Sequence, residues 1–156
     1  MIVVTDAGPL IYLAGAGELD TLRYLFDAVV VPQVVFDEVT VAGAGRIGSE
    51  EVAAATWLRV EIEAPDPRLL AMLDAGEASA IPLAERLHAM LLVDDTSARA
   101  VAEDRGIRIV GTLGVLLLAK RAGHVSLVAP ILERMAALGM YVSADLRRRV
   151  LQAAGE

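Results

Sequence analysis

The sequence contains no cysteine and only two histidines, His88 and His124. Without cysteine the chain forms no disulfide, has no thiolate nucleophile and offers no sulfur ligand to zinc. Two histidines far apart in the sequence leave little material for an imidazole-based site. A metal ion bound by this chain must therefore be held by oxygen ligands.

Long apolar runs are also missing, although 56% of the 156 residues are hydrophobic and the mean hydropathy is +0.55. The longest segments without a charge, such as residues 7–17 and 109–119, fall short of the roughly 18 apolar residues that a membrane-spanning helix needs. Asp6 interrupts the N-terminal apolar run and no basic segment precedes it, which argues against a secretory signal. We expect a cytoplasmic protein that does not associate with a membrane.

Basic residues are few, since 14 lysines and arginines face 21 acidic residues and leave a net charge of −7. This balance argues at first against nucleic acid as a partner, because phosphate backbones favour basic surfaces. Two divalent ions bound among the acids would offset part of the negative charge, and the arginines would then form a basic rim. The candidates for that rim are Arg46, Arg99, Arg105, Arg108, Lys120 and Arg121. For each of them an ordinary solvated helix face is the alternative.

The chain length fits a single domain over residues 1–156, with a helical tail over about 124–156. Short β-branched runs predict buried strands at residues 2–5, 28–31, 58–62, 90–93 and 107–110. Helices are predicted between and after them, at residues 9–14, 19–26, 33–40, 50–55, 67–73, 77–88, 96–105, 113–122, 127–138 and 144–153. This alternation predicts a three-layer α/β/α fold with a mostly parallel sheet of about five short strands. The surplus of apolar residues also leads us to expect a homodimer.

Acidic residues lie at points where a predicted strand or loop leads into a helix: Asp6, Glu38, Glu77, and the pair Asp94 and Asp95. The carboxyl ends of parallel strands meet at one edge of a sheet, where ligands bind. Carboxylates gathered there repel one another unless a cation joins them. The pattern therefore predicts a divalent metal site at this edge.

Each acid also has a purely structural explanation. Asp6 would shape the turn that follows it, and Glu77 would favour the first turn of a helix. Asp95 would cap the next helix, with a stabilisation of ~1 kcal/mol. Glu38 would lie on a solvated helix face. One cap requires one residue only, so capping leaves Asp94 without a role, and the whole set carries more weight than any member.

Four segments carry a family resemblance. VVTDAGPLIYLAGAGELDTL and VVVPQVVFDEV resemble the first and second strands of PIN domains, each followed by an acid-bearing turn or helix. DAGEASAIPLAERL and MLLVDDTSARAVAEDRGIRIVGTLGVLLLAKRAG resemble a PIN subgroup with Gly-Glu-Ala at the third acid and Gly-Thr-Leu-Gly after the last strand. The chain up to about residue 138 thus resembles the PIN-domain metal-dependent ribonucleases, and within them the VapC-like toxins of prokaryotic toxin–antitoxin systems.

The resemblance implies roles for the acidic residues. It implies that the catalytic acids are Asp6, Glu38, Glu77 and Asp95. It also implies that the metal ligands are Asp6, Glu77 and either Asp95 or Asp94. The third acid is a glutamate rather than an aspartate, and the Thr-x-Asp pattern common at the fourth site is absent. We favour Asp95 over Asp94 as the fourth ligand. The implied activity is hydrolysis of RNA with Mg²⁺ or Mn²⁺, and the implied partner is a small antitoxin whose C-terminal segment fills the acidic groove.

Two other classes of function remain open from the sequence. One is a non-catalytic PIN-like interaction module, in which the acids are caps or remnants. The other is a phosphoacceptor receiver-like domain. A receiver would carry its acidic pair after the first strand and a lysine after the last, whereas here the pair follows the fourth strand and Lys120 lies within a predicted helix.

Overall fold

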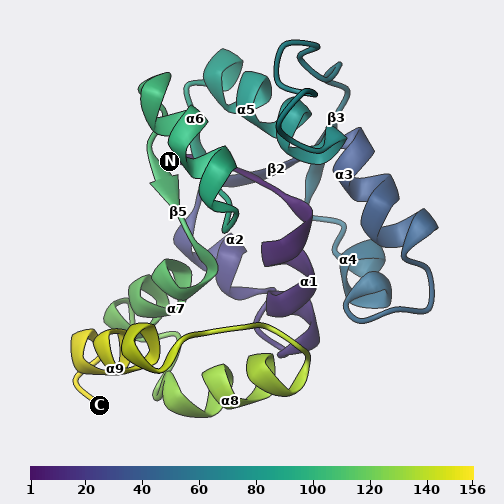
Figure 1. The fold of residues 1–156 in the computed structure, drawn as a ribbon. Helices are drawn as coiled ribbons and strands as arrows, with labels where there is room; N and C mark the ends of the chain where they lie inside the picture. Colours follow the sequence, from purple (N-terminus) through teal and green to yellow (C-terminus); the bar gives the residue numbers. More distant parts are fainter.

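The computed structural model describes residues 1–156 and contains a five-stranded sheet between two layers of helices (Figure 1). The strands are β1 (Ile2–Thr5), β2 (Ala28–Pro32), β3 (Arg59–Glu61), β4 (Met90–Leu92) and β5 (Ile109–Val110). Their spatial order is β3-β2-β1-β4-β5, and every neighbouring pair is parallel. The predicted three-layer α/β/α fold is confirmed.

The central strands are buried on both faces of the sheet. Val3 packs into the apolar cluster on one face, and Val4 packs into the cluster on the other. The same alternation holds in β2, where Val29 and Val31 face one cluster and Val30 the other. The expectation of burial on both faces is wrong for β3 and β5, whose residues are exposed or half-buried, because both are edge strands.

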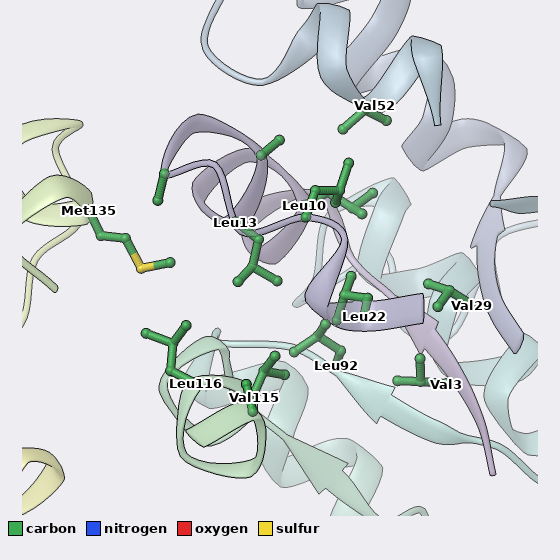
Figure 2. Packing of buried hydrophobic residues seen from close by; sticks show 14 of the residues in the cluster. Val3, Leu10, Leu13, Leu22, Val29, Val52, Leu92, Val115, Leu116 and Met135 are labelled. Carbon is green, nitrogen blue, oxygen red and sulfur yellow. The ribbon is translucent and has the colours of Figure 1, made fainter. Parts of the chain in front are cut away.

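Four helices cover one face of the sheet, and together they enclose a core cluster of 25 buried residues. They are α1 (Ala7–Gly15), α2 (Thr21–Leu25), α7 (Thr112–Arg121) and α8 (Ala129–Ala137). Figure 2 shows Leu13 of α1, Leu116 of α7 and Met135 of α8 directed into the space between the three helices. The last helix, α9 (Ala144–Ala153), packs on α7 and contributes Val150 to this core. The core therefore holds α1 firmly at the carboxyl end of β1.

Two helices, α5 (Ala75–Leu87) and α6 (Thr96–Asp104), cover the opposite face with a cluster of 15 buried residues. Pro82 lies inside α5 and has no N–H to donate to the carbonyl of Ala78. The amide of Asp66 donates to that carbonyl instead, at 2.9 Å. The proline thus leaves the carbonyl of Ala78 free to bind the loop that precedes α5.

The helix predicted over residues 67–73 is absent, and the segment forms turns. The Asp66 carboxylate accepts a hydrogen bond from the Arg68 amide at 3.0 Å, a local turn contact that competes with helix formation. Leu69 and Leu73 nevertheless reach the core beneath α5 and α6. The loop is therefore held by its apolar residues and by Asp66.

The helix predicted over residues 33–40 consists of two parts. It begins as α3 (Gln33–Asp37) and continues as η1 (Glu38–Ala42), a π-helical turn in which Gly43 donates to the carbonyl of Glu38 at 2.9 Å. A glycine-rich loop over residues 43–48 then leads to α4 (Ser49–Ala54). π-Helical turns are frequent at functional sites, and Glu38 lies at the start of this one.

No helix of the chain combines the length and the apolar character required to cross a bilayer.

Candidate functional site

The order of the strands reverses between β1 and β4, which are paired in parallel. In open parallel sheets such a switch point opens a crevice at the carboxyl ends of the strands. Asp6 directly follows β1, and its amide donates to the carbonyl of Leu92 at 3.1 Å. Asp94 and Asp95 follow β4. The first and fourth strands are thus neighbours, and the acidic residues that follow them share this edge.

Asp6 is buried at the start of α1, with 9% of its surface exposed. Its side chain makes no hydrogen bond that caps α1. The pKa of the Asp6 carboxyl is raised to about 7, mainly by burial, with smaller contributions from the carboxylates of Asp74, Glu77 and Glu38 and against the opposing effect of the Ala7 amide. A charged Asp6 is thus costly in the metal-free protein.

Glu77 is buried in the first turn of α5, which begins two residues earlier than predicted, at Ala75. Asp74 caps this helix in a reciprocal pair: the Glu77 amide donates to Asp74 Oδ1 at 2.8 Å, and the Asp74 amide donates to Glu77 Oε2 at 3.2 Å. Asp74 was not among the predicted site residues. Its signal is readable in the sequence as Asp-x-x-Glu, the spacing of a capping box.

Gly76 lies between the carboxylates of Asp6 and Glu38. A Cβ atom at position 76 would stand 3.1 Å from Asp6 Oδ1 and 3.3 Å from Glu38 Oε2. Both carboxylates therefore approach the bare backbone of the first turn of α5, although they come from β1 and from η1. The start of η1 thus brings the Glu38 carboxylate to the same glycine as the Asp6 carboxylate.

The pKa values of Glu38 and Glu77 are raised as well. Burial raises the pKa of Glu38, with a further contribution from Asp74. Burial also raises the pKa of Glu77, with contributions from Asp74, Asp95 and Glu38 against the opposing amide of Asp74. We call the five carboxylates that this repulsion connects the acidic cluster: Asp6, Glu38, Asp74, Glu77 and Asp95.

The adjacent aspartates after β4 cap two different helices. Asp95 Oδ2 accepts from the Ala98 amide at 2.9 Å and caps α6. Asp94 accepts from the Thr112 amide at 2.8 Å and from the Thr112 hydroxyl at 2.6 Å, at the first residue of α7. The argument that capping leaves Asp94 without a role is therefore wrong. Asp95 acts electrostatically on Glu77, whereas Asp94 and the Thr112 hydroxyl satisfy each other.

The donor set of the acidic cluster fits a hard divalent cation, since every donor is a carboxylate oxygen and Gly76 leaves room beside two of them. In their present orientations no three acidic or histidine side chains converge closely enough to hold an ion. Binding would thus require rotation of the glutamate side chains.

The fold agrees with comparisons to known proteins. Residues 2–156 match the family model described as a PIN domain, DUF3368. A solved PilT N-terminus domain protein from the hyperthermophilic archaeon Sulfolobus solfataricus P2 has 16% identity and a TM-score of 0.53, over 92% of this chain and 98% of that one. A domain of a functionally unknown protein from Methanocaldococcus jannaschii DSM 2661 has 23% identity and a TM-score of 0.45, over 70% and 89% of the two chains.

No curated protein matches the chain. The Sulfolobus structure shares the fold alone at this level of identity. The family model, in contrast, spans all but the first residue. The chain therefore belongs to the PIN-domain family.

Proposed function

We propose that this chain is a metal-dependent endoribonuclease that hydrolyses RNA phosphodiester bonds with Mg²⁺ or Mn²⁺. PIN domains are generally nucleases, which sets the class of reaction. The observation that carries the proposal is the approach of the Asp6 and Glu38 carboxylates to Gly76 at the switch point of the sheet.

Asp6, Glu77 and Asp95 would hold the ion, and Glu38 would complete the catalytic acids. A divalent ion in such a site lowers the pKa of a bound water and offsets charge on the phosphate. The Asp74 amide already fixes one oxygen of Glu77 at 3.2 Å, so Asp74 would orient that ligand. We favour Asp95 over Asp94, because both oxygens of Asp94 are engaged by Thr112.

The proposal is tested by incubating single-stranded RNA with the purified chain, with added Mn²⁺ or with EDTA. Asp6→Asn removes a buried carboxylate while it preserves side-chain volume, and it is expected to abolish cleavage. Asp104→Asn is the matched control, since Asp104 is exposed at the last residue of α6 and makes no ion pair or side-chain hydrogen bond. Equal metal-dependent cleavage by the wild type and Asp6→Asn would contradict the assignment of Asp6 to the catalytic site.

We further propose that the chain is a cytoplasmic, homodimeric VapC-like toxin restrained by a small antitoxin. The motif resemblance supports this, as do exposed apolar side chains on η1 and the loop after it, Val41 and Ile47, which suit a protein partner. Induced expression is expected to arrest growth with the wild type and not with Asp6→Asn. Normal growth in both cases would contradict the assignment as a toxin, and a monomeric mass in solution would contradict the homodimer.

A non-catalytic interaction module is the second candidate. Three of the acids have structural roles as helix caps, namely Asp74, Asp94 and Asp95. This alternative predicts no cleavage under any metal condition. A receiver-like phosphoacceptor is set aside, because the strand order β3-β2-β1-β4-β5 differs from the 2-1-3-4-5 order of that fold.

A further inference from the structure

A groove of about 580 Å³ adjoins the acidic cluster and shares Glu38 with it. Its walls come from α1, η1, the loop over residues 43–48 and the end of α8. The side chains that give it chemical character are Tyr12, Glu38, Arg46, Ile47 and Leu138. If one bond of a polymer lies at the acidic cluster, the unit next to that bond would lie in this groove.

The wall that carries Arg46 is fixed by close packing against α1. Gly48 has a φ of +81°, and a Cβ there would lie 3.0 Å from the carbonyl oxygen of Ile11. A Cβ on Gly15 would lie 2.5 Å from Ile47 Cγ2 and 2.8 Å from Leu138 Cδ1. Glycine at both positions thus allows the loop over residues 43–48 to pack closely against α1. The wall of the groove is therefore held in place by these contacts.

Arg46 is exposed at the groove, and its guanidinium makes no ion pair or hydrogen bond with any protein group. Most other arginines are engaged: Arg86 binds Glu61 and Glu63, and Arg134 binds Glu18. A free guanidinium beside an acidic cluster, on a chain of net charge −7, is complementary to an incoming anion.

Tyr12 supplies an aromatic ring to the same groove. The residue is half-buried on α1, and its hydroxyl makes no hydrogen bond within the protein. An aromatic face combined with a cation is the usual arrangement for single-stranded nucleic acid, because a base stacks on the ring while the cation meets a phosphate.

We infer that this groove binds the RNA nucleotide next to the cleaved bond, with its base stacked on Tyr12 and its phosphate held by Arg46. The inference rests on the proposed function, since it assigns the groove to the same substrate. A protein segment is the competing occupant. The unpaired guanidinium favours RNA because it suits a phosphate, and the shared Glu38 places the groove beside the bond that we propose is cleaved.

The test measures binding of a labelled single-stranded RNA to Asp6→Asn protein over a range of salt concentrations. Adding Arg46→Gln is expected to weaken binding and to reduce the slope of log affinity against log salt by about 0.7, the value for one phosphate contact on a single strand. Adding Tyr12→Leu is expected to weaken binding by about tenfold without changing the slope.

Two matched controls accompany these variants. Arg147→Gln removes an arginine of α9 whose only ion pair, with Glu133, spans 3.8 Å, and it is expected to change neither affinity nor slope. Tyr12→Phe keeps the ring and is expected to bind like its parent. Binding unaltered by both Arg46→Gln and Tyr12→Leu, or absent in the parent, overturns the groove assignment and leaves a protein partner as the candidate occupant.

Cleavage by the otherwise wild-type chain separates this inference from the proposed function. Failure to cleave, with RNA binding that still depends on Arg46, would contradict the nuclease and support the groove. Cleavage that is equal in wild type, Arg46→Gln and Arg147→Gln would support the nuclease and contradict the groove.

Discussion

Gly76 and Asp6 are packed so closely that a Cβ on Gly76 would stand 3.1 Å from Asp6 Oδ1. The same Cβ would lie 3.2 Å from Val35 Cγ2 and 3.3 Å from Glu38 Oε2. Alanine at position 76 would therefore displace two carboxylates that come from separate parts of the chain.

Gly76→Ala is expected to lower RNA cleavage by roughly tenfold or more, since small displacements of catalytic groups are costly. Stability is expected to change by less than about 1 kcal/mol, because the helix propensity of alanine offsets the crowding. Cleavage rates and urea unfolding measure the two effects. Gly8→Ala is the control, as its added methyl group meets nothing within 4 Å. Full activity in Gly76→Ala would show that the approach of the carboxylates is irrelevant.

In the metal-free protein, Asp6 is expected to contribute stability that is lost as pH rises. The pKa of Asp6 is about 7 in the folded state against 3.8 for an ordinary aspartate, so the folded state binds the proton more tightly between these values. This contribution is fully present below about pH 4 and is lost as pH rises through about 7.

The Asp6→Asn variant has no carboxyl group at this position, so its stability does not fall with pH for this reason. In EDTA the variant should therefore gain stability relative to wild type between about pH 5 and pH 8, by on the order of a few kcal/mol. Thermal melts at both pH values give the comparison. A difference between the proteins that is the same at both values would contradict the pKa assigned to Asp6.

The two adjacent aspartates are expected to behave differently. Asp94→Ala removes the cap of α7 and should cost about 1–2 kcal/mol in unfolding free energy. Asp95→Asn should lower Mn²⁺ affinity more than Asp94→Asn does, because Asp95 belongs to the acidic cluster and Asp94 is bound to Thr112. Urea unfolding and calorimetric titration separate the roles. The reverse order of Mn²⁺ affinities would make Asp94 the ligand.

Asp66 is expected to contribute stability that disappears in acid. Hydrogen bonds from Arg68 and Arg105 lower the pKa of its carboxyl to about 2. The contribution is present above the ordinary aspartate pKa of about 4 and is lost as pH falls through about 2.

Asp66→Asn should therefore be less stable than wild type at neutral pH, and the difference should shrink toward about pH 2. Urea midpoints across this range provide the measurement, with Asp104→Asn as a variant that has no ion pair to lose. Equal stability of Asp66→Asn and wild type at neutral pH would show that the contacts of Asp66 are not stabilising.

The sequence was sufficient to predict the central strands and the edge at which the acids lie. Runs such as residues 2–5 and 28–31 are apolar on both faces, and such runs occur in buried parallel strands. That the acids after the first and fourth strands share one edge depends on these strands being neighbours, which the strand pairing shows.

Other features depend on contacts between distant residues and carry no local pattern. The partner of Asp94 is Thr112, which lies on a helix that begins after the next strand. The π-helical turn at Glu38 and the close approach of Gly76 to Asp6 arise only when α5 packs beside α3. Asp74 differs, because its capping-box spacing was readable and was overlooked when the helix was predicted to begin at Glu77.

The central claim is that the acidic cluster binds a divalent cation through Asp6, and calorimetric titration with Mn²⁺ at neutral pH tests it most directly. The account predicts saturable binding by the wild type and by Asp104→Asn, with affinity reduced by about tenfold or more in Asp6→Asn. No binding by the wild type at millimolar Mn²⁺, or equal binding by Asp6→Asn, would contradict it.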